Sequence, residues 1–167
     1  MKRTRPLVAA LAFVAATAFT LPAAAQQADA VVGTWLTEAG DRGGKARVEV
    51  AREGGEMIGR IVWLEEPEFP DGEHAGEAKT DLENPDAALR DRPILGLRIL
   101  DGFTYAGRGT WRGGTIYDPA NGKTYKAKLY LDGDDDRTLD IRGYIGITLF
   151  GRTTTWKRVD RPAGGGD

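Results

Sequence analysis

The sequence predicts an all-β domain, an antiparallel up-and-down β-barrel of about eight strands with one long loop that bears a short helix. From residue 31 onward, apolar residues recur with a period of two, which is typical of strands that bury one face. Short turns rich in Gly, Asp and Asn separate these stretches. Such a meander can also form a sandwich, but only closure into a barrel removes both exposed sheet edges.

The expected strands follow one another with short connections, except at one place. In the clearest case, Ala127, Leu129 and Leu131 alternate with Lys126, Lys128 and Tyr130. The pattern predicts strands near residues 31–37, 45–52, 56–64, 94–100, 109–117, 124–132, 137–145 and 151–159. Glycines inside these stretches favour a barrel, because sharply coiled barrel strands often need them; they are Gly59, Gly113, Gly114 and Gly143.

The long segment 65–93 breaks this pattern. Residues 84–90 suit a short helix capped by Asn84 with Pro85 at its first position. Long ordered loops often carry function, although an inert plug over the core is the alternative. We expect Leu89, Ile94 and Leu95 to pack inward, so that the segment closes one barrel end and controls access to the interior.

The first 25 residues have the features of a cleavable secretory signal peptide. Lys2, Arg3 and Arg5 precede an apolar stretch that is too short to span a bilayer as a helix, and the small residues 23–25 suit signal peptidase. We therefore expect cleavage before Gln26, with an uncleaved anchor as the alternative. The predicted organisation is a signal peptide at 1–25, a barrel domain at 26–159 and a C-terminal tail at 160–167. We expect a periplasmic or extracellular location and no integral membrane span after cleavage.

Composition excludes several functions. The chain carries a net charge of −2, and removal of three basic residues with the signal peptide leaves about −5, which argues against binding to nucleic acid or to anionic membranes. The sequence contains no Ser, no Cys and a single histidine, His74, so it cannot form a Ser-His-Asp or Cys-His catalytic group. Zinc sites with two or more His or Cys ligands are excluded as well. We predict no cofactor and no metal.

Several motifs resemble a known family. Gly33-Thr34-Trp35 is similar to the G-x-W signature of lipocalins, and residues 156–158 are placed to cover that barrel end. The run from Trp111 to Tyr125, W-x-G-G-x-I-Y-D-P-x-x-G-K-T-Y, resembles the bacterial exported family catalogued as domain of unknown function 2147. Blocks at 33–37, 61–64, 80–90 and 142–156 agree. The family resemblance implies a small exported β domain and no activity, whereas the G-x-W match separately favours a lipocalin-like or calycin-like barrel.

Candidate binding residues come from the long segment and from polar strand faces. They are Asp81, Asn84, Arg90, Arg92, Tyr117, Asp118, Arg142 and Tyr144. Arg and Tyr side chains suit an anionic or amphipathic ligand if they line a pocket mouth, but they are plain surface residues if the apolar strand faces point inward. Asp118, before Pro119, also suits simple turn chemistry. The spacing of the oxygen ligands Asp81, Glu83, Asn84 and Asp86 does not match a helix-loop-helix calcium site.

The sequence therefore favours a non-catalytic β-barrel module of the cell envelope. It would bind a small apolar or amphipathic ligand or have a structural role. The alternative is a periplasmic hydrolase that uses carboxylates, with Asp81, Asp86, Asp101 and Asp118 as candidates. Sequence alone does not place two of these acids close together.

Overall fold

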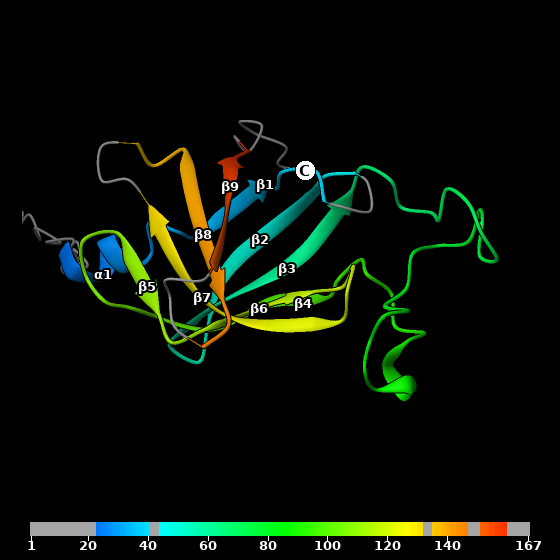
Figure 1. Ribbon diagram of the computed structural model, residues 1–167. Coiled ribbons are helices and arrows are strands. Elements are labelled where there is room, and N and C mark those ends of the chain that lie inside the picture. The colour runs from blue at the N-terminus through cyan, green and yellow to red at the C-terminus, as the bar shows by residue number, and fades with distance from the viewer. Residues whose placement is uncertain (1–22, 41–43, 132–134, 147–150, 160–167) are drawn as a thin grey trace, which may run out of the picture.

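A computed structural model describes residues 23–40, 44–131, 135–146 and 151–159. Nearly all of its regular structure is β-strand (Figure 1). The strands are β1 (Gly33–Leu36), β2 (Ala46–Glu53), β3 (Glu56–Leu64), β4 (Arg98–Tyr105), β5 (Thr110–Arg112), β6 (Thr115–Asp118), β7 (Lys123–Leu131), β8 (Thr138–Tyr144) and β9 (Gly151–Arg158). The helical parts are α1 (Ala23–Ala28) and a 3₁₀ turn η1 (Ala87–Leu89).

The strands form one closed antiparallel barrel, as the sequence predicted. The order runs β3-β2-β1-β9-β8-β7, and β4 pairs with β3 to close the ring. Both β5 and β6 lie between β4 and β7, so they occupy a single position and the barrel has eight strands with one of them divided. The closed barrel leaves no long free edge between its strands.

Two glycines explain the division of the strand predicted at 109–117. Gly113 has φ +86°, which is a conformation that other residues rarely adopt. At Gly114, a Cβ would lie 2.4 Å from the ring of Phe103. The strand is interrupted here because Gly113 adopts a positive φ and only glycine at position 114 leaves room for the Phe103 ring. A second boundary was wrong: β4 begins at residue 98, not 94, because Leu97 and Gly96 bond to Ile61 at the end of a turn.

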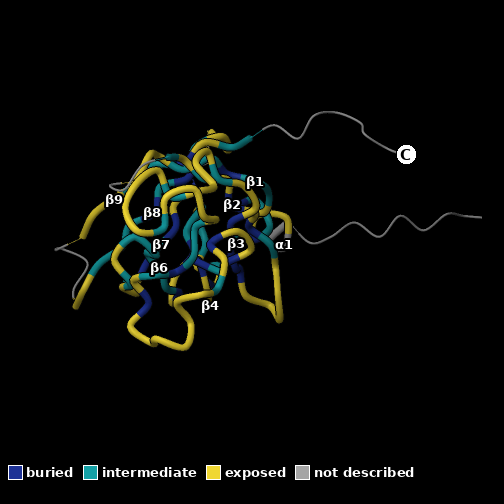
Figure 2. Tube along the Cα trace, turned by 90° about the vertical axis from the view of Figure 1, so that its right-hand side faces the viewer, coloured by how far each residue is buried: buried dark blue, intermediate teal, exposed yellow. Residues whose placement is uncertain are grey.

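Apolar side chains fill the inside of the barrel. On β7 and β8 most residues predicted to face inward are buried, including Leu129, Leu139 and Ile141, whereas Ile145, just after β8, is 70% exposed. Eighteen buried residues form one continuous cluster, in which Trp35 and Trp111 are the largest fully buried side chains. Figure 2 shows the buried positions running along the centre of the strands, with the exposed positions in the outer turns and loops. The polar residues of the opposite strand faces point outward.

The barrel end at β1 and β9 is held by a Trp-Arg pair. The guanidinium carbon of Arg158 lies 4.2 Å from the ring centre of Trp35, within the range of cation–π attraction. Arg158 also donates to the carbonyls of Val32 and Ala30, at 2.9 and 2.6 Å. The Trp35 indole donates to Val31 O at 2.9 Å. These contacts fix the chain before β1 across this end, and Arg158 belongs to the residues that were expected from the G-x-W resemblance to cover it.

The expected signal peptide lies mostly outside the described residues. Helix α1 includes the bond between Ala25 and Gln26 at which we expect cleavage. The carbonyl of Ala28, downstream of that bond, accepts a hydrogen bond from the Trp111 indole at 3.0 Å. In the described part of the chain, no helix is long and apolar enough to cross a membrane. The predicted tail, 160–167, also lies outside the description.

The long segment between β3 and β4 projects beyond the strand ends (Figure 1). Its two arms are joined by bridges between Glu68 and Ala78 and between Thr80 and Pro93. The expected helix is only η1, and the side chain of Asp86 caps it through Ala88 N, so the prediction of Asn84 as the cap was wrong. Asn84 is committed to a different contact, described below.

The apolar anchor of the segment also differs from the expectation. Leu89 is 39% exposed and Leu95 is 57% exposed, so the prediction that they pack inward was wrong. Ile94 is 7% exposed and belongs to the core cluster, as predicted. A 3₁₀ turn of three residues has no buried face, so Leu89 stays at the surface. Among the described residues, core side chains pack inside the barrel, which argues against the expected control of access to an open interior by the segment.

Candidate functional site

A buried carboxylate lies at the centre of the site. Asp81 is 0% exposed and accepts four hydrogen bonds. Its Oδ2 accepts from Nε and Nη2 of Arg92 at 2.8 and 2.7 Å and from Nδ2 of Asn84 at 2.7 Å, and its Oδ1 accepts from the Tyr117 hydroxyl at 2.6 Å. Asn84 Nδ2 also donates to the Tyr117 oxygen at 3.2 Å. We call these four residues the Asp81 cluster.

Local backbone geometry places three members of the cluster. The Asp81 N–H donates to Arg92 O at 3.0 Å, so the start and the end of the loop run side by side. Asn84 N–H donates to Asp81 O at 2.9 Å, and Asn84 Oδ1 accepts from Asp86 N, as in an Asx turn. Arg90 Nε then donates to the carbonyl of Asn84 at 2.9 Å. Short polar residues beside Pro85 thus turn the chain twice within six residues.

Tyr117 brings the fourth member from the barrel wall. It pairs with Thr124, whereas its neighbour Ile116 pairs with Leu100 of the core. Because alternate residues of a strand point to opposite faces, Tyr117 projects from the outer face of β6. Burial and the adjacent Asp81 carboxylate raise the pKa of the Tyr117 hydroxyl, in that order of importance. The hydroxyl therefore remains a proton donor to Asp81 well into the alkaline range.

A second contact fixes the loop to the turn between β6 and β7. Gly122 has φ +68°, and a Cβ on it would lie 1.8 Å from the carbonyl oxygen of Glu83. The two backbones therefore touch directly at this point. The block around Asn84-Pro85 and the run 111–125, in which Gly122 lies, therefore meet at this point.

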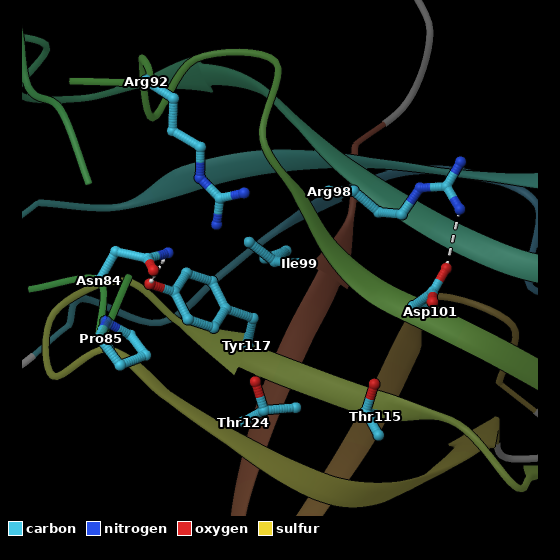
Figure 3. Close-up of a pocket in the computed structure, with 10 residues that line it drawn as sticks. Asn84, Pro85, Arg92, Arg98, Ile99, Asp101, Thr115, Tyr117 and Thr124 are labelled. Atoms are coloured by element: carbon cyan, nitrogen blue, oxygen red, sulfur yellow. Dashed lines mark hydrogen bonds and ion pairs between the residues drawn. The ribbon is translucent and has the colours of Figure 1, made fainter. Parts of the chain in front are cut away.

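An open cleft of about 310 Å³ lies beside the cluster on the outer face of the barrel (Figure 3). One wall is the loop, with Asn84, Pro85 and Arg92. The other is the sheet, which contributes Arg98, Ile99, Asp101, Thr115, Tyr117, Gly122 and Thr124. Asp101 pairs with Thr115 across β4 and β6, so they are neighbours on the outer face. The cleft is thus framed by rigid strands and by a loop that the Asp81 cluster holds in place.

The predicted site residues divide into two groups. The first group forms the cluster itself and consists of Asp81, Asn84, Arg92 and Tyr117. Arg90 contacts the cluster through its hydrogen bond to the carbonyl of Asn84. The other three candidates, Asp118, Arg142 and Tyr144, are not among the residues that line the cleft.

Each of these three has a local role. The Asp118 side chain stabilises the turn between β6 and β7, where it accepts hydrogen bonds from Ala120 N at 3.0 Å and from Asn121 Nδ2 at 2.8 Å. Arg142 and Tyr144 lie on the outer face of β8, where Arg142 donates to Thr153. The interpretation of these two as surface residues agrees with the inward direction of the apolar faces.

Sequence reasoning missed the sheet side of the cleft. Arg98, Ile99, Thr115 and Thr124 were not candidates, and Asp101 was considered only as an acid. Their sequence signal was ordinary strand alternation, which does not tell which outward-facing residues become neighbours. That information lies in the register between β4, β6 and β7.

The geometry does not favour acid–base hydrolysis at Asp81. The Asp81 side chain is completely buried and held by four donors, and it is not among the residues that line the cleft. Asp101 is 57% exposed in its side chain and bonds to Arg98 at 2.8 Å. Within the described residues, no group of three or more His, Cys, Asp or Glu side chains is placed to hold a metal ion.

Comparison with known proteins establishes the family. A family model described as "Uncharacterized protein conserved in bacteria (DUF2147)" matches residues 33–158. The chain belongs to this family. The matched region runs from the first residue of β1 to the last of β9 and includes both motifs that meet at Gly122. A search of curated proteins gave no match.

One solved structure supports the DUF2147 barrel as a lipocalin-like fold. It is described as "Protein HP1028 from the human pathogen Helicobacter pylori belongs to the lipocalin family". It shares 24% identity with this chain and superposes with a TM-score of 0.64, covering 78% of this chain and 83% of its own. At this level of identity, the likeness concerns the fold.

Proposed function

We propose that this DUF2147 protein is an exported, non-catalytic binding module of the bacterial cell envelope, and that it binds a small ligand in the cleft beside the Asp81 cluster. The observation that carries the proposal is the fixed loop wall: a fully buried carboxylate with four donors holds it against the strands. Binding sites work best on rigid elements with locked supporting contacts. The cleft volume lies at the lower end of the range for small-molecule sites.

The barrel interior is a poorer candidate for the binding site. An eight-stranded barrel is just wide enough either to be filled by side chains or to hold one small ligand. Here eighteen buried residues form a single packed cluster that includes Trp35, Phe103 and Trp111. A ligand along the barrel axis would have to displace these side chains, whereas the outer cleft is open.

Export rests on the N-terminal sequence. A basic start, a short apolar stretch and small residues at 23–25 are the features of a cleavable signal peptide. We expect mass spectrometry of the periplasmic or extracellular fraction to find a chain that begins at Gln26. A chain that retains Met1 in that fraction, or one found only in the cytoplasm, would contradict export while leaving the cleft untouched.

A thermal-shift screen of the mature domain tests the binding site. The probes are neutral sugars, inorganic anions and fatty acids, because a compound that binds only the native state raises the melting temperature. The test variant, Thr124→Trp, places a bulky side chain in the cleft from an exposed position of β7. The control variant, Thr104→Trp, adds the same side chain at an exposed position of β4 that does not line the cleft.

We expect a probe that stabilises the parent domain to stabilise the Thr104→Trp variant equally and to lose its effect on the Thr124→Trp variant. Equal stabilisation of all three proteins by a fatty acid would place binding elsewhere and refute the outer cleft.

A further inference from the structure

The cleft offers hydrogen-bonding groups of both kinds. The hydroxyls of Thr115 and Thr124 line it, and among the described residues neither makes a side-chain hydrogen bond. A hydroxyl can both donate and accept. Asp101 uses Oδ1 on Arg98, which leaves its Oδ2 as an acceptor toward the cleft. The Arg92 guanidinium adds N–H donors on the opposite side.

Both guanidinium groups that line the cleft are already paired with carboxylates. Arg92 is paired with Asp81, and Arg98 lies between Asp101 and Glu53, to both of which it donates. Two guanidinium groups thus face three carboxylates, which leaves no positive excess to attract an anion. A cation would have to compete with these two guanidinium groups for carboxylates that they already bind. Uncompensated charge is costly at a partly buried site, so this arrangement selects for a neutral ligand.

Apolar surface lies between these polar groups. The cleft lining includes Ile99, which is 7% exposed, together with Pro85 and Tyr117. Figure 3 shows Ile99 next to the Tyr117 ring, with the two threonine hydroxyls on the strands beyond it. A ligand that fits this lining combines C–H faces with hydroxyls that both donate and accept.

We infer that the cleft binds a neutral polyhydroxylated compound of the saccharide class. This inference rests on the proposed function, since it names the ligand of the same cleft. In this arrangement, Thr115, Thr124 and Asp101 on the sheet and Arg92 on the loop bind the sugar hydroxyls. Ile99 and Pro85 contact the carbon skeleton.

Titrations followed by amide chemical shifts of the ¹⁵N-labelled mature domain test the ligand class. The probes are N-acetylglucosamine, maltose and inorganic phosphate. We expect at least one sugar, and not phosphate, to shift the amides of Thr115, Gly122 and Thr124 in a saturable way. Thr124→Val removes one hydroxyl and should weaken sugar binding roughly 2- to 12-fold, the worth of one hydrogen bond. The matched control, Thr104→Val, should leave affinity unchanged.

Asp101→Asn separates the two ligand classes. It removes a charged acceptor at a side chain that is 57% exposed, so a saccharide should bind roughly fivefold more weakly or worse. An anion should instead bind more tightly to this variant. Phosphate-dependent shifts at the cleft that strengthen in Asp101→Asn would overturn the inference and leave the proposed function standing. The inference would also be overturned if the sugars, even at tens of millimolar concentration, shifted no amide at the cleft. If laurate then shifts the core amides of Leu129 and Ile141, the ligand binds inside the barrel, and the proposed binding site in the outer cleft is refuted as well.

Discussion

Replacing Tyr117 with Phe removes one atom from the centre of the Asp81 cluster. The lost hydroxyl donates to a buried carboxylate over 2.6 Å. Asp81 keeps its three other donors and Asn84 keeps its bond to Asp81, so the variant leaves no buried group without a partner. The variant should therefore lose only the contribution of this hydrogen bond to the free energy of unfolding, without the larger penalty of a buried charge that has no partner.

The expected loss is about 1.5–3 kcal/mol, because a hydrogen bond to a charged group contributes about that much to stability. For a domain of this size, this corresponds to a fall of roughly 4–10 °C in melting temperature. Denaturation in urea measures the free energy of unfolding of the mature domain, and the transition slope should not change. Removal of Asp81 itself, as Asp81→Ala, should cost about 3–5 kcal/mol because it leaves several donors without their acceptor.

Tyr144→Phe provides the matched control. Tyr144 lies half-exposed on the outer face of β8, with Lys128 over its ring at 6.0 Å, and its hydroxyl makes no bond to the described part of the protein. Its replacement should change the free energy of unfolding by less than about 0.5 kcal/mol. If both Tyr→Phe variants lose equally little, the cluster does not hold the loop and the reasoning fails.

The same hydroxyl predicts a pH dependence. Burial, followed by Asp81, raises the pKa of Tyr117 above its ordinary value of 10.0, so the folded state keeps the proton more tightly than the unfolded state does. This contribution to stability is complete below pH 10 and is lost as the pH rises through the folded-state pKa. Between pH 8 and 11, the parent should lose more stability than Tyr117→Phe. Parallel curves for the two proteins would contradict the assignment.

Two further pairs of variants test how the long segment is attached. Gly122→Ala places a Cβ within 1.8 Å of Glu83 O and should cost clearly more than Gly54→Ala, where φ is similarly positive at +59° but nothing lies within 4 Å; the control should lose only about 1–2 kcal/mol from backbone strain. Ile94→Ala should cost about 2–4 kcal/mol because Ile94 is buried, whereas Leu89→Ala should cost under about 1 kcal/mol because Leu89 is exposed. Both comparisons use urea unfolding, and a reversed order in either pair would show that the segment is attached differently.

Strand alternation predicted the barrel well because it depends on local physics. In β7 and β8 most residues of the predicted inner face are buried as the pattern indicated, including Leu129 and Ile141. The glycines that suggested a barrel also divide one strand at Gly113. By contrast, the start of β4 was misplaced, because Ile94 looks like a strand residue but packs into the core from a turn.

The candidate site was predicted in part for a related reason. The polar residues of the long loop indicated Asp81, Asn84 and Arg92, which the structure brings together through side-chain hydrogen bonds. The sheet side of the cleft depends on which strands are neighbours. Asp101 and Thr115 meet through the pairing of β4 with β6, and no local pattern specifies that register.

Hydrogen exchange at the base of the loop tests the central claim most directly: that the segment from 79 to 94 is a fixed wall of an outer cleft and not an opening lid. The N–H groups of Asp81 and Ile94 donate to Arg92 O and Lys79 O, each at 3.0 Å. We predict strong protection for both, approaching that of Leu129 in β7, and a clear loss of protection in the Tyr117→Phe variant. Rapid exchange of both amides in the parent domain, with Leu129 still protected, would show that the segment opens independently of the barrel and would contradict this account.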